Sequence, residues 1–199
     1  MIKDCVLLAV EDTLSEAVAR AALSSLRMSA SQTIGLKGNT YLKKKVSALN
    51  KTAKAFPVFL LTDLDKPTSC PPELISGWIS EPIEEALIFR VAIVEIESWV
   101  MADRAAFAAM LGISPARVPR EPDKVREPKE KIVTLAKSSR KRSVREDIVP
   151  TRGSTASRGP GYNARLGAFV GTEWDPLRAS EASPSLKRAL SALKRFRDG

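Results

Sequence analysis

Residues 57–65 read PVFLLTDLD, a run of apolar side chains that ends in two aspartates, Asp63 and Asp65. A short, continuous apolar run with a proline at its start is typical of a strand buried in a parallel sheet. Open α/β sheets bind their ligands at the edge where the strands end. The two carboxylates are therefore expected at a ligand-binding edge, where they could hold a cation.

Two other apolar runs also lead into acidic residues. Residues 4–10 (DCVLLAV) precede Glu11, and residues 87–94 (LIFRVAIV) precede Glu95 and Glu97. Helical patterns lie between these runs, and strands that alternate with helices imply parallel strands joined by right-handed crossovers. We therefore predict an α/β fold with a mainly parallel central sheet flanked by helices. The acids of three strands are expected to meet at one edge of that sheet.

The first helical pattern follows Glu11 closely. Residues 13–16 (TLSE) match a capping box, with Thr13 as the N-cap and Glu16 three positions later. This pattern predicts that Glu16 caps a helix rather than binds a ligand, and that Asp12 favours the helix dipole. Further patterns predict a weaker strand at 33–36 and helices at about 40–51, 74–78 and 99–111.

The composition of the chain changes after residue 112. We predict an α/β core of residues 1–112 and a basic, mostly helical extension of residues 113–199 that packs on it, with helices near 129–137, 162–170 and 185–196. Residues 1–100 carry 11 basic and 12 acidic side chains, whereas residues 101–199 carry 21 basic and 11 acidic ones. A basic half of this kind indicates a polyanionic partner, most often nucleic acid, although a solvated surface that aids solubility has the same composition.

The candidate contacts to a nucleic-acid backbone are basic residues near the expected edge and in the extension. They are Lys37, Lys66, Arg140, Lys141, Arg142, Arg152 and Arg158. The last two fall in a Gly/Ser/Pro-rich loop at residues 150–161 (PTRGSTASRGPG). This loop lacks the Gly-Lys-Ser/Thr signature of a P-loop, so ATP hydrolysis by this chain is not expected.

The composition also excludes several classes of protein. The chain has no histidine, which rules out Ser-His-Asp and Cys-His catalysis and most zinc sites. Its two cysteines, Cys5 and Cys70, form no disulfide framework. No apolar run approaches the roughly 20 residues that cross a bilayer, and the first residues lack a signal-peptide pattern. We expect a cytoplasmic protein without a membrane partner, whose chemistry uses carboxylates, Lys, Arg, hydroxyls and a hard cation.

The expected cofactor is Mg²⁺ or Mn²⁺, because these ions bind carboxylate oxygens and leave room for water and a substrate phosphate. We assign Glu11, Asp63 and Asp65 as catalytic residues and metal ligands, and Glu95 or Glu97 as a ligand that completes a second metal site. Glu95 and Glu97 have an alternative role as first-turn acids of the following helix. Asp-x-Asp also occurs in haloacid-dehalogenase-type phosphatases and in glycosyltransferases. The threonine of the phosphatase signature is one position late here, and the chain is short for a glycosyltransferase fold.

The sequence resembles Toprim domains, the metal-binding modules of type IA topoisomerases, bacterial primases and OLD-family nucleases. Those domains have a glutamate after the first strand and Asp-x-Asp after the third, which Glu11, Asp63 and Asp65 match. More closely, the chain resembles the uncharacterised Toprim-like family DUF4276. The stretches that carry this resemblance are VEDTLSE (10–16), LTDLD (61–65), EIESWVMAD (95–103), GYN (161–163), WDP (174–176) and SPSL (183–186). Many Toprim domains have glycine where this chain has Asp12.

The resemblance implies nuclease or nucleotidyl-transfer chemistry, often beside an ABC/AAA-type ATPase in bacterial defence against phage. It also implies that Glu11 transfers a proton. Two other functions stay open. The chain could be a non-catalytic nucleic-acid-binding or regulatory subunit, or it could act on a phosphate of a small molecule. The sequence leaves open the choice between DNA and RNA, and whether copies of the chain form a homo-oligomer.

Overall fold

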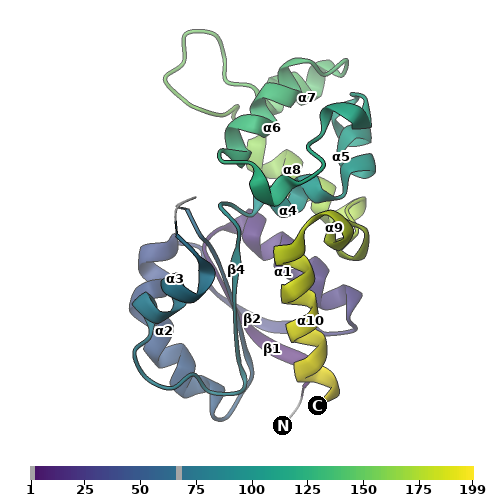
Figure 1. Ribbon diagram of the computed structural model, residues 1–199. Helices are drawn as coiled ribbons and strands as arrows, with labels where there is room; N and C mark the ends of the chain where they lie inside the picture. The colour runs from purple at the N-terminus through teal and green to yellow at the C-terminus, as the bar shows by residue number, and fades with distance from the viewer. Residues whose placement is uncertain (1–2, 66–68) are drawn as a thin grey trace.

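The computed structural model describes residues 3–65 and 69–199 of the chain (Figure 1). At its centre is a four-stranded, all-parallel sheet with the strand order β2-β1-β3-β4. The strands are β1 (Cys5–Val10), β2 (Ser29–Gly35), β3 (Val58–Asp63) and β4 (Leu87–Ala92). The predicted α/β class, with a parallel central sheet flanked by helices, is confirmed.

Helices cover both faces of the sheet because successive side chains of each strand point to opposite faces. One face packs against α1 (Thr13–Ser25) and α10 (Pro184–Asp198), and the other against α2 (Asn39–Ala53) and α3 (Pro71–Trp78) (Figure 1). Leu8, Phe59 and Ile88 belong to the first face, and their neighbours along the strands belong to the second. This burial on both sides explains why β1, β3 and β4 are apolar runs, whereas the edge strand β2 is more polar and partly exposed.

The remaining helices follow β4 or lie in the C-terminal half. They are α4 (Glu97–Ala102), α5 (Arg104–Leu111), α6 (Pro128–Lys137), α7 (Arg142–Ile148), α8 (Tyr162–Thr172) and α9 (Pro176–Ala182), with 3-10 turns at Pro115–Arg117 and Pro122–Lys124. Figure 1 shows α5, α6 and α7 beyond the edge where the strands end. The C-terminal region is helical, as predicted, and the boundary at residue 112 stays a prediction. Within 3–65 and 69–199, no helix is long and apolar enough to span a bilayer.

Two expectations about helices were wrong. The predicted helix at 99–111 is divided at Asp103, whose φ and ψ of −77° and 70° are not helical. Helix α1 is capped by Asp12 and not by Thr13, because the extended backbone of Asp12 lets its Oδ1 accept the N–H of Ser15 at 2.8 Å. Glu16 is not part of a capping box, and it accepts hydrogen bonds from Arg20 and Thr33 instead.

Several stretches that carry the resemblance meet in the core and hold the C-terminal half in place. The indole Nε1 of Trp99 donates to Ser185 Oγ at 2.6 Å, and Nε1 of Trp174 donates to the carbonyl of Trp99 at 3.2 Å. The buried carboxylate of Asp103 accepts the guanidinium of Arg178 at 2.7 Å. These contacts join α4 to α9 and α10. They give Trp99, Asp103 and Trp174 a structural role.

Candidate functional site

The register of the sheet brings Glu11 to the end of β3. Val10 pairs with Leu61, so the residue after Val10 lies beside the next residue of β3, Thr62. The Oε1 atom of Glu11 accepts the backbone N–H of Asp63 at 2.8 Å and also the hydroxyl of Thr62. Two predicted site residues that are 52 positions apart are thus directly linked at the carboxyl edge of the sheet.

Asp63 and Glu11 are poorly solvated at this edge. The side chain of Asp63 is buried, and burial followed by the charges of Glu11 and Glu97 raises the pKa of its carboxyl well above the usual value. Burial also raises the pKa of Glu11, with a smaller contribution from Asp65, although its hydrogen bonds from Thr62 and Asp63 oppose the shift. Burial is thus the main cause of both raised pKa values, and the charges of neighbouring carboxylates add to it.

Asp65 lies at the rim of the same edge and is exposed to solvent. Its φ of 58° is left-handed, and its backbone N–H donates to the carbonyl of Val94 at 2.8 Å. Val94 itself has a φ of 62°, which is strained for a β-branched residue. The amide of Asn39 donates to Asp65 Oδ2 at 2.5 Å. The turns after β3 and β4 are therefore hydrogen-bonded to each other. Each contains a residue in the left-handed conformation that residues other than glycine disfavour.

The two glutamates after β4 differ in environment. Glu97, in the first turn of α4, is 1% exposed, and burial raises its pKa to about 7. Its Oε1 accepts the hydroxyl of Tyr162 at 3.3 Å, whereas its buried Oε2 has no hydrogen-bond partner among the described residues. Glu95 is half-buried, and its carboxylate accepts hydrogen bonds from the backbone N–H and from the Nζ of Lys129. The first-turn role is correct for Glu97, and its two oxygens also face Tyr162 and Lys129.

Lys129 is a part of the site that the sequence analysis missed. Its Nζ lies 3.0 Å from Glu95 Oε1, 3.8 Å from Glu97 Oε2 and 4.0 Å from Asp63 Oδ2. Burial lowers the pKa of Lys129, but the three carboxylates outweigh this effect and hold the pKa above its usual value. One signal was available in the sequence: the dipole of a helix disfavours a lysine in its first turn, so a compensating acid was required.

Tyr162 is the second residue that was missed, and it comes from the C-terminal half. Burial and the charge of Glu97 raise the pKa of its hydroxyl, so Tyr162 acts as a neutral hydrogen-bond donor. The guanidinium of Arg158 lies 5.2 Å from the centre of its ring, a cation–π contact. Residues 161–163 had been noted as part of the resemblance, but nothing in their spacing pointed to the acidic cluster.

The donor set fits a hard divalent cation, although it is not arranged as a ready metal site. Carboxylate oxygens suit Mg²⁺ and Mn²⁺, and the buried Oε2 of Glu97 accepts no hydrogen bond among the described residues, its ion-pair partner Lys129 lying 3.8 Å away. Across the described ranges, however, no three acidic or thiol groups are close enough to hold a metal ion as they stand. Lys129 is the cation that occupies the space between Asp63, Glu95 and Glu97.

A cavity of about 430 Å³ opens next to the cluster. Residues from four parts of the chain line it, among them Asp65, Glu95, Lys129 and Arg158. Arg158 is thus a predicted phosphate contact that shares this cavity with Asp65 and Glu95. Lys37 is exposed after β2, with its Nζ 5.5 Å from the ring of Tyr41.

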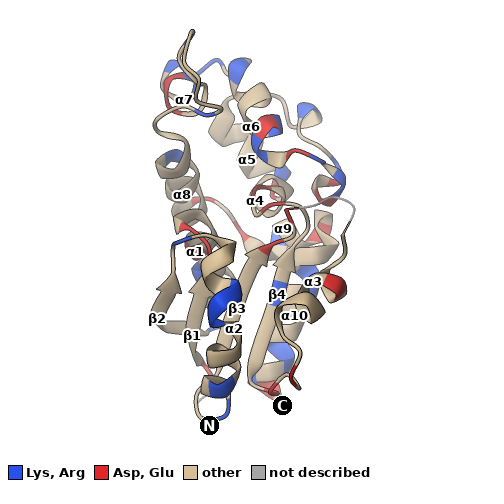
Figure 2. Ribbon diagram, turned by 90° about the vertical axis from the view of Figure 1, so that its left-hand side faces the viewer, with Lys and Arg blue, Asp and Glu red and all other residues tan. Residues whose placement is uncertain are grey.

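The other predicted nucleic-acid contacts lie farther along the C-terminal half, and Figure 2 shows basic segments on and around α7. Arg140, Lys141, Arg142 and Arg152 are exposed. Two of them already have protein partners, since Nζ of Lys141 donates to the carbonyl of Ala109 at 2.8 Å and Arg142 pairs with Glu146 at 2.7 Å. Lys66 lies outside the described residues.

Comparisons of the chain with protein-family models, with curated proteins and with solved structures found no match. The Toprim-like resemblance therefore stays a prediction, and the function is argued below from the site itself.

Proposed function

We propose that this chain is a cytoplasmic, divalent-metal-dependent nuclease that hydrolyses phosphodiester bonds of DNA or RNA. The observation that carries the proposal is the carboxylate cluster at the carboxyl edge of the sheet. Asp63, Glu95 and Glu97 gather there around the ammonium group of Lys129, and Glu11 is hydrogen-bonded to the backbone of Asp63. Among the described residues these four acids outnumber the one lysine that contacts three of them, and this excess of carboxylates favours binding of a divalent cation.

Glu11, Asp63 and Asp65 would hold the metal, with Glu97 or Glu95 completing a second site. When bound, the metal would lower the pKa of a water molecule and stabilise negative charge at phosphorus. Glu11 is suited to transfer a proton, because its half-buried carboxylate has a raised pKa and is oriented by Thr62 and Asp63. Arg158, beside the adjacent cavity, would bind the substrate phosphate.

The position of Lys129 has a consequence for metal binding. Its ammonium group contacts three of the acids that are assigned to the metal, so a divalent cation must compete with it for the same oxygens. Since Lys129 belongs to α6, metal binding would loosen the contact between α6 and the end of β4. Such a link would let a partner that moves α6, for example an ATPase subunit in a phage-defence complex, control the site.

The same lysine favours the second candidate, a non-catalytic nucleic-acid-binding or regulatory subunit. If Lys129 permanently offsets the charge of Glu95 and Glu97, the cluster is a structural ion-pair network and the basic half alone binds the partner. The two candidates differ in whether Mg²⁺ or Mn²⁺ binds the chain at all.

The test uses Asp63→Asn, which keeps the shape of the side chain and removes the charge. Plasmid, single-stranded DNA and RNA are incubated with the wild type and the variant in Mg²⁺, Mn²⁺ or EDTA. We expect metal-dependent cleavage by the wild type and at least a hundredfold loss in the variant. In metal-free buffer the variant should be as stable as the wild type or more stable, because a crowded carboxylate is gone.

Thermal unfolding with added Mn²⁺ completes the test. Mn²⁺ should raise the Tm of the wild type by mass action and raise that of Asp63→Asn less. If Mn²⁺ stabilises neither protein and no nucleic acid is cut, the nuclease proposal is wrong and the regulatory subunit replaces it.

A further inference from the structure

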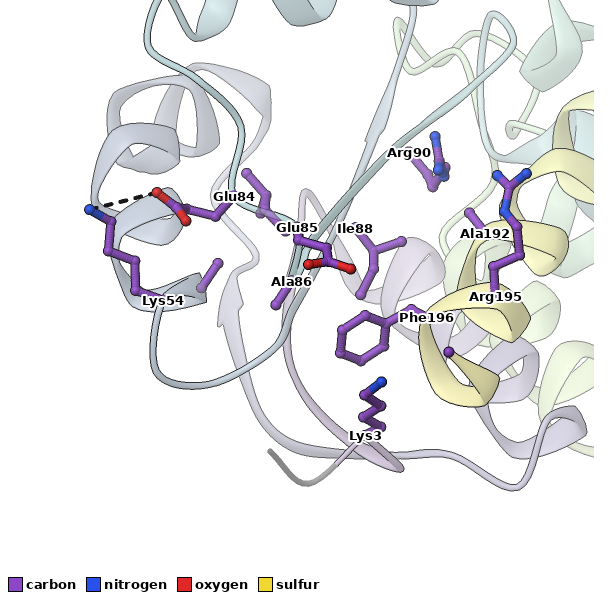
Figure 3. A pocket seen from close by; sticks show the side chains of 13 residues that line it. Lys3, Lys54, Glu84, Glu85, Ala86, Ile88, Arg90, Ala192, Arg195 and Phe196 are labelled. Carbon is purple, nitrogen blue, oxygen red and sulfur yellow. Dashed lines mark ion pairs between the residues drawn. The ribbon is translucent and has the colours of Figure 1, made fainter.

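A second cavity, of about 520 Å³, lies beside the edge strand β4 (Figure 3). Arg90 of β4, Arg195 and Phe196 of α10, and Lys3 before β1 contribute to its wall. None of the predicted site residues lines it. Its size falls within the range of sites for small molecules, roughly 300–1,000 Å³.

Arg90 and Arg195 face this cavity as two like charges without a counter-ion. The buried Nε of Arg90 has no hydrogen-bond partner among the described residues, and within the same ranges no carboxylate lies within 4.0 Å of either guanidinium group. Burial lowers the pKa of Arg90, and the charge of Arg195 lowers it further. Arg90 is half-buried and Arg195 is exposed, and an anion placed between them would relieve the repulsion between their charges.

The other charged groups of the cavity do not supply that anion. Glu84 is held on the far side of the cavity by Lys54, at 3.6 Å (Figure 3). Glu85 also lines the cavity and is exposed, and Figure 3 shows its carboxylate near Ile88 and the ring of Phe196. The wall thus combines two guanidinium groups that have no ion pair among the described residues, the carboxylate of Glu85, and the ring of Phe196, with Nζ of Lys3 6.0 Å from the ring centre.

We propose that this cavity binds a small phosphate monoester, with its phosphate between Arg90 and Arg195. Guanidinium groups bind phosphate with two parallel N–H donors, and a phosphate between the two arginines would offset the repulsion between their charges. The organic part of the ligand would pack on Phe196 and donate a hydroxyl or amino hydrogen to Glu85. This combination of groups fits a nucleoside monophosphate.

The experiment measures binding of inorganic phosphate, AMP and adenosine by calorimetry, at constant ionic strength. It compares the wild type with Arg90→Met, Arg195→Met and the control Arg188→Met. Arg188 is an exposed arginine of the same helix that does not line the cavity, so it matches the change in charge. AMP should bind the wild type and the control with equal affinity, and binding to Arg90→Met and Arg195→Met should be at least tenfold weaker. Adenosine, which lacks the phosphate, should bind none of them measurably.

Stability gives an independent readout. Without phosphate, Arg90→Met should be at least as stable as the wild type, because an unpaired buried donor and a repulsive contact are removed. Arg195→Met should fold normally, because Arg195 is exposed. The proposal is wrong if AMP and phosphate do not bind the wild type, or if all four proteins bind them equally. The acidic cluster plays no part in this test, so its result is independent of the nuclease proposal.

Discussion

Lys129 binds Glu95 with two donors at once: its Nζ lies 3.0 Å from Oε1 and its backbone N lies 3.0 Å from Oε2. The carboxylate of Glu95 therefore accepts from the first turn of α6 and neutralises a lysine that the helix dipole disfavours there. This pair joins the end of β4 to the C-terminal half, and it places an ammonium group next to Asp63 and Glu97.

The first prediction concerns Lys129→Met, which removes the ammonium group and keeps most of the apolar stem. Without metal, the variant should lose roughly 1–3 kcal/mol of unfolding free energy, because Glu95 and Glu97 lose their cation. Its affinity for Mn²⁺ should rise at least tenfold, since the competing cation is gone. Calorimetric titration with Mn²⁺ and denaturant unfolding measure the two effects.

The control for this change is Lys137→Met, an exposed lysine of the same helix with no recorded ion pair among the described residues. It should leave the affinity for Mn²⁺ unchanged and lower the free energy of unfolding by less than about 1 kcal/mol, because Lys137 lies in the last turn, where the helix dipole favours a lysine. Equal Mn²⁺ affinity for the wild type and Lys129→Met would contradict competition between Lys129 and the metal, while leaving the metal site itself in place.

The second prediction is a pH dependence that originates at Glu97. Its pKa is about 7 in the folded chain and near 4.5 when unfolded, so the folded state binds more protons between these values. Stability must then fall as pH rises from about 4.5 to 7, by up to about 3 kcal/mol from this group. The raised pKa values of Glu11 and Asp63 act in the same direction.

Glu97→Gln should flatten this slope, because glutamine does not titrate. Urea unfolding at several pH values between 4.5 and 7.5, without divalent metal, gives the comparison. If Glu97→Gln leaves the wild-type slope unchanged, other carboxyl groups cause the dependence of stability on pH.

The third prediction concerns the glycines that close the 150–161 loop. A Cβ on Gly159 would lie 2.4 Å from the carbonyl oxygen of Asp147, and the N–H of Gly159 donates to the carbonyl of Ile148 at 2.9 Å. Gly159→Ala must therefore push the loop away from α7, at a cost of about 1–3 kcal/mol. The push would also move Arg158 and Tyr162 relative to Glu97.

Gly167→Ala is the matched control, because nothing lies within 4 Å of a Cβ at this position in α8. Alanine is the better helix former, so this variant should be more stable by about 0.5–1 kcal/mol. Thermal unfolding of the wild type and both variants measures the two changes in stability. Equal stability of the two variants would show that the loop is not held against α7.

The fourth prediction separates a nucleic-acid surface from a solvated one. Arg140, Arg142 and Arg152 are exposed, whereas Lys141 also binds the carbonyl of Ala109 and is better left in place. Changing the three arginines to alanine should weaken binding of DNA or RNA and reduce the slope of log K against log salt by up to about 3. Fluorescence anisotropy at several salt concentrations measures this slope.

The comparison variant changes three exposed lysines of α2, namely Lys43, Lys44 and Lys51, to alanine. It alters the net charge equally but should leave the slope nearly intact. A slope that falls by the same amount in both variants would mean that net charge alone attracts the nucleic acid.

Local residue patterns were enough to predict β1, β3, β4 and the parallel sheet, whereas β2 begins at Ser29, before the predicted strand at 33–36. The continuous apolar runs before Glu11, Asp63 and Glu95 can only be buried on both faces, and this requirement follows from local residue patterns. Parallel strands end at the same edge, so the convergence of Glu11 and Asp63 could be predicted as well. The short helices α7 and α9 were missed because helices of this length depend on packing more than on their own residues.

Only the tertiary structure decided what surrounds these acids. Lys129 and Tyr162 reach Glu97 from positions 32 and 65 residues later in the chain, through contacts that no spacing rule contains. The strand register decided that Glu11 is oriented by Thr62 and Asp63. The pKa shifts of the acids follow from burial and from the distances between charges, and both exist only once the chain has folded. The residue types therefore indicated a cation site, whereas the fold decided that a lysine already lies within it.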